Sequence, residues 1–159
     1  MAKILKTITI PSPILRKISK DVDEKNIKSK ELKTFCLSLV ATMKKKDGVG
    51  LAAPQVGRNI RIFSIDSKDG PIVFINPKFV KKSWAKDWSE EGCISVPQTF
   101  GKVKRSKKIV CEYIDINGEK RKIEANGLMA FVMQHENDHL DGVLFIDKAK
   151  EIEKIVEEK

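Results

Sequence analysis

The segment Gln134-His135-Glu136-Asn137-Asp138-His139-Leu140 constrains this chain most, because it contains both of its histidines. On an α-helix, residues four positions apart project from one face, so both imidazoles can reach one cation while Glu136 stands beside them to carry protons. The alternative is that the two histidines only pack on a helix face and form hydrogen bonds.

Local signals favour a helix here. Gly127 and Gly142 bracket the segment, and no proline interrupts it. Apolar residues and the first histidine recur at three- and four-residue steps, at Leu128, Phe131, Val132 and His135. This spacing predicts an amphipathic, largely buried helix.

A catalytic metal site of this kind needs a third protein ligand and one open position. No histidine or cysteine follows His139, so Asp141, Asp147 and Glu151 are the downstream alternatives. Upstream, Cys93 lies after a glycine and before a Ser-x-Pro segment, where its thiol can project from a strand edge and bind a metal as thiolate. The competing interpretation of Cys93 is a small buried residue.

Length and composition indicate one globular domain. The chain has 159 residues, of which 41% are hydrophobic and 33% charged, so we expect a single domain over residues 1–159. Its net charge of +9 is spread along the chain. Such basicity is compatible with work near RNA or ribosomes, but without a nucleic-acid motif we expect a solvated lysine-rich surface and no specific nucleic-acid binding.

Cysteine usage and hydropathy bear on the compartment. Three cysteines without paired spacing argue against a disulfide framework. No apolar run approaches a membrane span, and residues 1–10 lack the apolar core of a signal peptide. We therefore expect a cytoplasmic protein with no membrane partner, and an organellar location stays open.

The remaining pattern predicts an α+β fold. Apolar spacing predicts a long amphipathic helix over residues 25–46 and a short C-terminal helix over residues 148–159. Strand-like runs cover residues 61–66, 72–75, 79–88 and 102–116, and Asn117-Gly118 predicts a hairpin with residues 120–125. We expect one compact domain with antiparallel or mixed sheets around the central histidine helix.

Three motifs, in this order, resemble those of peptide deformylases. They are Gly48-Val49-Gly50-Leu51-Ala52-Ala53-Pro54-Gln55, Glu91-Gly92-Cys93-Ile94-Ser95 and Gln134-His135-Glu136-Asn137-Asp138-His139. The similarity extends from about Ile4 to Phe145. It implies removal of the formyl group from N-formylmethionyl nascent peptides. We expect a monomer, and transient ribosome contact stays open.

The resemblance also implies roles for individual residues. Cys93, His135 and His139 would bind one divalent metal, iron(II) in the cell, with zinc, nickel or cobalt as substitutes. Glu136 would be general base and then general acid, while Gln55 and the backbone N–H of Ile94 would donate to the oxyanion. Gly50 would lie beside the bound peptide, and the methionine pocket would be lined by Val49, Leu128, Phe131 and Val132, each of which also has a core-packing interpretation.

Some positions depart from the family pattern. Ile94 replaces the usual leucine, and Phe100 stands where many relatives carry an arginine that helps to hold the peptide. Arg105 and Glu91 match common positions, and we expect an ion pair between them. The alternatives are a small zincin-like peptidase, which would take a ligand downstream of His139, and a catalytically inactive basic module that binds RNA or ribosomes.

Overall fold

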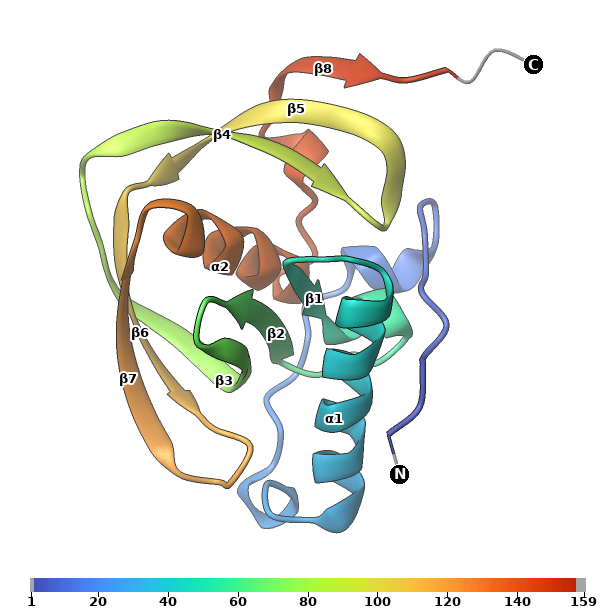
Figure 1. Ribbon diagram of the computed structural model, residues 1–159, viewed down its shortest axis with the longest axis vertical. Helices are drawn as coiled ribbons and strands as arrows, with labels where there is room; N and C mark the ends of the chain where they lie inside the picture. The colour runs from blue at the N-terminus through green and yellow to red at the C-terminus, as the bar shows by residue number, and fades with distance from the viewer. Residues whose placement is uncertain (1, 157–159) are drawn as a thin grey trace.

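The computed structural model describes residues 2–156 (Figure 1). Two α-helices and eight strands form its framework, and four short 3₁₀ helices connect them. In chain order these are η1 (Pro13–Arg16), η2 (Glu24–Asn26), α1 (Lys30–Lys45), β1 (Gly50–Ala52), η3 (Ala53–Val56), β2 (Ile62–Ser67), β3 (Gly70–Lys82), β4 (Lys86–Cys93), β5 (Val96–Ser106), β6 (Lys108–Ile114), β7 (Lys120–Asn126), α2 (Gly127–Leu140), η4 (Phe145–Asp147) and β8 (Lys150–Lys154). None of the helices in residues 2–156 has both the length and the apolarity needed to cross a membrane.

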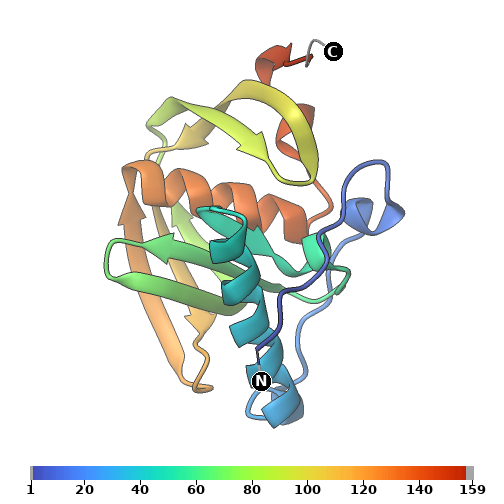
Figure 2. The same ribbon diagram turned by 45° about the vertical axis from the view of Figure 1, so that its right-hand side comes forward.

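Two antiparallel sheets enclose α2. A five-stranded sheet has the order β1-β2-β3-β6-β7, and a three-stranded sheet has the order β4-β5-β8. Figures 1 and 2 show α2 between them, with α1 on the outer side of the larger sheet. This arrangement confirms the predicted α+β class, with the histidine helix at its centre.

Alternating residues of the larger sheet separate its two cores. Leu51, Ile62 and Val73 pack in the same cluster as the buried face of α1. Their neighbours Phe63 and Phe74 pack instead with the α2 side chains. Because successive side chains of a strand point to opposite faces, one sheet provides a base for both helices.

The helix α2 is buried on two sides, and this changes the predicted pattern. Its polar residues Gln134, His135, Glu136 and His139 are buried, whereas Leu128 is 72% exposed. Of the residues predicted to form an apolar stripe toward the core, Val132 packs against it and His135 is buried, whereas Leu128 departs from the prediction. A helix that lies between two sheets has no fully solvated face, so its polar side chains must find partners inside the protein.

The expected strand boundaries around residues 79–88 and 102–116 were wrong. Both runs break where a two-stranded ribbon passes from one sheet to the other, at 83–85 and at Lys107. Across this bend, Ser83 N–H donates to Lys108 O, and Lys107 N–H donates to Ala85 O, both at 2.9 Å. The two strands bend together, which the alternation of a single strand does not reveal.

Both predicted end helices need correction. The N-terminal helix begins at Lys30, because Ser29 caps it by accepting a hydrogen bond from Leu32 N–H at 3.1 Å; residues 24–26 form a separate 3₁₀ turn. The predicted C-terminal helix is the strand β8 in its described part, paired with the edge of β5. Residues 157–159 of that prediction lie outside the described residues. The hairpin at Asn117-Gly118 is confirmed, with β6 and β7 in antiparallel register.

Candidate metal centre

Three potential ligands from two elements converge at the inner side of the smaller sheet. Cys93 ends β4, and His135 and His139 stand one turn apart on α2. One donor atom from each side chain lies within 4.8 Å of the others, and Cys93 Sγ is 3.4 Å from His139 Nε2. A thiolate with two imidazoles is a donor set that suits iron(II), zinc, nickel or cobalt.

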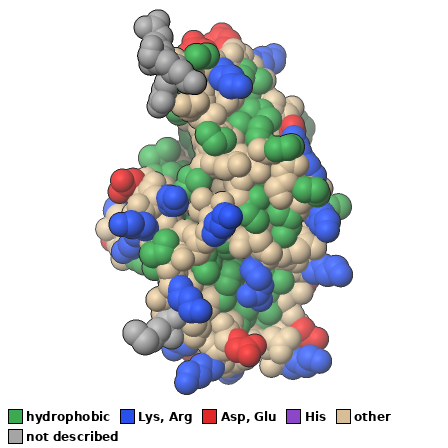
Figure 3. Space-filling view, turned by 90° about the vertical axis from the view of Figure 1, so that its right-hand side faces the viewer, with side chains coloured by type: hydrophobic (Ala, Val, Ile, Leu, Met, Phe, Trp, Pro, Cys, Tyr) green, Lys and Arg blue, Asp and Glu red, His purple; other side chains and the backbone are tan. Residues whose placement is uncertain are grey.

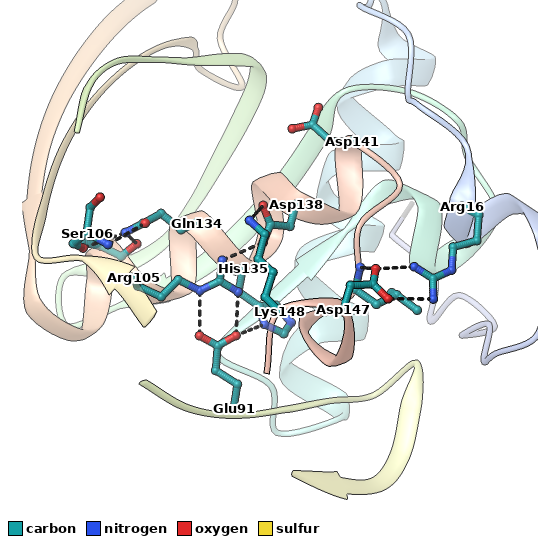
Figure 4. A network of polar contacts seen from close by, with 12 residues as sticks. Arg16, Glu91, Arg105, Ser106, Gln134, His135, Asp138, Asp141, Asp147 and Lys148 are labelled. Carbon is teal, nitrogen blue, oxygen red and sulfur yellow. Dashed lines mark hydrogen bonds and ion pairs between the residues drawn. The ribbon is translucent and has the colours of Figure 1, made fainter. Parts of the chain in front are cut away.

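A buried ion-pair network orients the first histidine (Figure 4). His135 Nδ1–H donates to Glu91 Oε1 at 2.7 Å, which leaves Nε2 for a metal. Glu91 is held in turn by two hydrogen bonds from Arg105, at 2.7 and 2.8 Å. Arg105 also donates to Asp138, which accepts a further bond from Lys148. The expected pair of Glu91 and Arg105 therefore exists, and it fixes the ring of a candidate ligand.

The surroundings of the two histidines shift their pKa values in opposite directions. Burial opposes charge on His135, but hydrogen bonds with Cys93 and Glu91 outweigh it and raise its pKa to about 10. Burial and the neighbouring His135 lower the pKa of His139 well below its usual value. A proton is thus favoured on His135 and disfavoured on His139. A single divalent cation that displaces the proton of His135 fits these surroundings.

Glu136 is almost fully buried, and its surroundings favour the protonated form. Burial raises its pKa to about 7, and Oε1 has no hydrogen-bond partner among the described residues. Gly50 lies against this carboxyl group: a Cβ at residue 50 would come within 2.5 Å of Glu136 Oε2. The structural reason for a glycine here is therefore contact with Glu136, whereas the sequence suggested only room for a peptide.

The Gln55 side chain is also buried, on η3. Its Oε1 accepts a hydrogen bond from Ala52 N–H at 2.9 Å, which determines the orientation of the amide. Its Nε2 then points to Cys93 Sγ at 3.4 Å and to Ser95 Oγ at 3.2 Å. The amide donor group is thus directed at the metal centre.

A cavity of about 330 Å³ opens beside these groups. Its size falls within the range of small-ligand pockets, roughly 300–1,000 Å³. Several expected substrate and site residues line it together, namely Val49, Gly50, Gln55, Cys93, Ile94, Leu128, Phe131, Val132, His135 and Glu136. His139 lies deeper and is 1% exposed.

Comparison with known proteins gives a consistent result. Residues 4–155 match the family model described as "Polypeptide deformylase". The chain is 45% identical to a peptide deformylase of Dictyoglomus thermophilum over 150 residues, which covers 94% of this chain and 95% of that protein. The chain belongs to the peptide deformylase family.

Solved structures of this family share the fold. The crystal structure of peptide deformylase from Thermotoga maritima superposes with a TM-score of 0.88 at 39% identity, covering 93% of this chain and 99% of that one. A peptide deformylase from Synechococcus elongatus in complex with actinonin gives 0.87 at 38% identity, covering 94% and 81%. A third, from Acinetobacter baumannii with Met-Ala-Ser bound, gives 0.89 at 32% identity, covering 93% and 99%. Members of the peptide deformylase family are hydrolases that act on an N-formyl amide.

The downstream acids considered as third ligands lie elsewhere in the structure. Asp141 pairs with Arg61, Asp147 with Arg16 and Glu151 with Lys102. Figure 4 shows the pair of Asp147 with Arg16 at some distance from the network around Glu91. Of the alternatives that the sequence left open, only Cys93 lies with the two histidines.

Three residues around the site were not singled out from the sequence. Asp138 completes the partners of Arg105. Ser95 links Gln55 to the N-terminal segment by donating from Oγ to Ile8 O at 2.7 Å. Gln134 anchors α2 to the end of β5 through two hydrogen bonds with the Ser106 backbone. All three stand inside the motifs, but their role depends on partners distant in sequence.

Proposed function

We propose that this chain hydrolyses the N-formyl amide of N-formylmethionyl nascent peptides at the centre formed by Cys93, His135 and His139. The supporting observation is that Cys93, His135, the Glu136 carboxyl group and the Gln55 amide line one cavity, and that the donor atom of His139 lies within 4.8 Å of those of Cys93 and His135. The products would be formate and a peptide with a free amino-terminal methionine.

The three donors would hold one divalent metal, iron(II) in the cell, and zinc, nickel or cobalt in its place. Such an ion supplies Lewis acidity and makes hydroxide available near neutral pH. Glu91 supports this arrangement because it accepts from His135 Nδ1 and directs Nε2 inward. The thiolate of Cys93 would offset one of the two positive charges.

Glu136 would carry the proton. With a pKa of about 7, its carboxyl group both accepts and releases a proton at neutral pH. As the carboxylate it would take a proton from the attacking water, and as the acid it would pass the proton to the departing amine nitrogen when the C–N bond breaks. General acid–base catalysis of this kind contributes about 10²–10⁴-fold.

Gln55 and Ile94 would stabilise the oxyanion that develops from the formyl oxygen. The Gln55 amide is oriented in advance by Ala52 N–H, and its Nε2 would donate to the oxyanion in place of its contact with Cys93 Sγ. Ile94 would act through its backbone N–H, for which the identity of the side chain matters little. Loss of one such donor typically lowers turnover by about 10²–10³-fold.

The apolar wall of the cavity would select methionine. Leu128, Phe131 and Val132 lie on the α2 side, and Val49 lies across from them before β1. Leu128 and Val49 are 72% and 57% exposed, so an apolar substrate side chain would cover part of this surface. Lack of room beside the donors and Glu136 would favour formyl over larger acyl groups.

The partners of this enzyme follow from its substrate. Nascent peptides leave the ribosome in the bacterial cytoplasm or in an organelle of similar translation, and we place the activity there. We propose that the chain works as a monomer. Its C-terminal strand, with Glu151 and Glu153 between lysines, is poorly suited as a basic ribosome-docking tail.

The decisive experiment combines metal analysis with a formate-release assay. Protein purified without oxygen should hold one metal per chain and release formate from formyl-Met-Ala-Ser. Glu136→Gln should keep the metal and lose at least 10²-fold in kcat. Cys93→Ala should lose the metal itself. Full activity in Cys93→Ala, or metal retention without formate release in the unmodified protein, would contradict the proposal.

A further inference from the structure

A second surface with a distinct composition lies where β3 passes into β4. It comprises residues 81–88 and 104–108, which we term the lysine–tryptophan ribbon. The backbone hydrogen bonds at Ser83 and Lys107 join the two segments at the bend, and β4 pairs with β5 on from there. Figure 1 shows β3 and β6 leading to this bend, and β4 and β5 leaving it.

The ribbon concentrates positive charge. It presents six exposed lysines and one exposed acidic residue, Asp87; these lysines are Lys81, Lys82, Lys86, Lys104, Lys107 and Lys108. None of the six forms an ion pair with an acidic group among the described residues. By contrast, the face seen in Figure 3 shows lysines and arginines dispersed over apolar and neutral atoms, with acidic side chains among them. Folding thus brings two basic segments together into one region of positive electrostatic potential.

Both tryptophans of the chain lie in the same ribbon. Trp84 is 99% exposed and Trp88 is 46% exposed. The ammonium groups of Lys104 and Lys150 lie 5.7 and 5.9 Å from the Trp88 ring centre. These contacts hold cations over the one ring, while the other ring is open to solvent.

We infer that the lysine–tryptophan ribbon is a binding surface for single-stranded RNA. Lysines can neutralise the phosphates, and exposed indole rings can stack on unpaired bases. Unpaired bases are required because a duplex keeps its base faces inside the stack. The amino-acid sequence provided no reason to expect sequence-specific nucleic-acid binding. Binding at this surface would not depend on the base sequence, since every base offers a face for stacking.

An anionic membrane is the other polyanion that lysine and tryptophan could meet, and the geometry favours it less. Membrane-surface binding uses a broad apolar face, usually on an amphipathic helix. The ribbon is instead a pair of strands with two separate rings among lysines. Strand β4 runs from the ribbon to Cys93, so bound RNA would lie along the same strand as the metal centre but outside its cavity.

Intrinsic fluorescence provides a direct test, because both tryptophans belong to the ribbon. Titration of the metal-loaded protein with a single-stranded oligouridine at about 50 mM salt should quench this fluorescence, with a Kd on the order of 10 µM. Raising the salt concentration should weaken binding. A plot of the logarithm of the binding constant against the logarithm of the salt concentration should have a slope of about −0.7 for each phosphate contacted. A duplex RNA of equal charge should bind more weakly and quench less.

Matched variants separate the ribbon from the general charge of the protein. The double variant Lys82→Glu/Lys108→Glu should weaken binding at least tenfold. Lys30→Glu/Lys33→Glu removes the same charge from exposed positions on α1 and should have a much smaller effect. Trp84→Ala, measured by anisotropy of labelled RNA, should weaken binding about tenfold. Because the Trp84 side chain is exposed to solvent, the Trp84→Ala variant should have the same melting temperature as the unmodified protein.

Several results would overturn the inference. They are no quenching at low salt, equal weakening by both double variants, equal affinity for duplex and single strand, or unchanged affinity in Trp84→Ala. Preferential binding to vesicles with anionic phospholipid, with a blue shift of the emission, would assign the surface to membranes instead. Each measurement is independent of formate release, so the hydrolytic proposal is tested separately.

Discussion

At the scale of single residues, Gly50 is the position where packing constrains the residue type most clearly. It allows the backbone of β1 to contact the Glu136 carboxyl group, where a Cβ would come within 2.5 Å of Oε2. We expect Gly50→Ala to displace Glu136 and to lower kcat by about 10²-fold, as a small misplacement of a reacting group does. Metal content should not change, which atomic absorption can check.

Gly48→Ala is the matched control for this change. A Cβ at residue 48 meets its nearest neighbours at 3.4 to 3.6 Å, which is ordinary van der Waals contact. Its kcat should stay within a few-fold of the unmodified enzyme. If both variants lose activity equally, the loss reflects the loop and not the contact with Glu136.

The three cysteines differ sharply in environment. Cys36 and Cys111 are fully buried, and burial raises the pKa of each thiol to about 12. Cys93 is half-buried beside the cavity. We expect iodoacetamide to modify one thiol in the metal-free folded protein, at Cys93, and metal to protect it. Mass spectrometry of the digested protein identifies the site, and modification of Cys36 at a similar rate would contradict this expectation.

At the scale of elements, Glu91 connects the smaller sheet to α2. Burial alone would raise its pKa, but hydrogen bonds from Arg105 and His135 outweigh burial and lower the pKa to about 2. A lowered folded-state pKa stabilises the fold above the unfolded value of 4.5, and this contribution disappears as the pH falls toward 2. The shift corresponds to roughly 3 kcal/mol at neutral pH.

Glu91→Gln should therefore reduce the free energy of unfolding at pH 7 by up to about 3 kcal/mol. The difference from the unmodified protein should shrink as the pH falls from 4.5 toward 2, because the Glu91 carboxylate is protonated first in the unfolded chain and then in the folded protein. Urea denaturation of the metal-free proteins at pH 7 and pH 3 measures this difference. A gap that stays constant with pH would mean that the ionised carboxylate contributes nothing specific.

The elements also show what sequence patterns can and cannot predict. The histidine helix and the Asn117-Gly118 hairpin depend on near neighbours, and both follow from local spacing. The pattern of Glu151-Ile152-Glu153 is compatible with a strand as well as with a helix. The segment forms a strand because it pairs with the edge of β5. The breaks near Ser83 and Lys107 likewise result from pairing between distant segments.

Some features of the candidate site could likewise be predicted from local sequence, and others could not. Glu136 and both histidines are brought together by one helix, so their proximity could be predicted from a four-residue step. The resemblance to deformylases was needed to choose Cys93 over Asp141, Asp147 and Glu151, because nothing local relates β4 to α2. The contact of Asp138 with Arg105 and the link from Gln55 through Ser95 to Ile8 were not foreseen, since they depend on how the layers pack.

At the scale of the whole molecule, the metal would link two layers. Cys93 comes from the smaller sheet, and both histidines come from the helix beneath it. A ligand that binds only the folded state adds RT ln(1 + [L]/Kd) to its stability, about 2.7 kcal/mol at a hundredfold excess over Kd. For a chain of this size, we expect the melting temperature to rise by roughly 5–10 °C.

Metal binding should also couple amide hydrogen exchange in the smaller sheet to exchange in α2. Because the donors bridge them, zinc should slow amide hydrogen exchange in residues 86–106 and in residues 127–140 together. Circular dichroism gives the melting temperature, and mass spectrometry of exchanged peptides gives the protection of each segment. Cys93→Ser, in which the bridge is broken, should lose the common protection. Protection confined to α2 in the unmodified protein would mean that the two histidines bind the ion without the sheet.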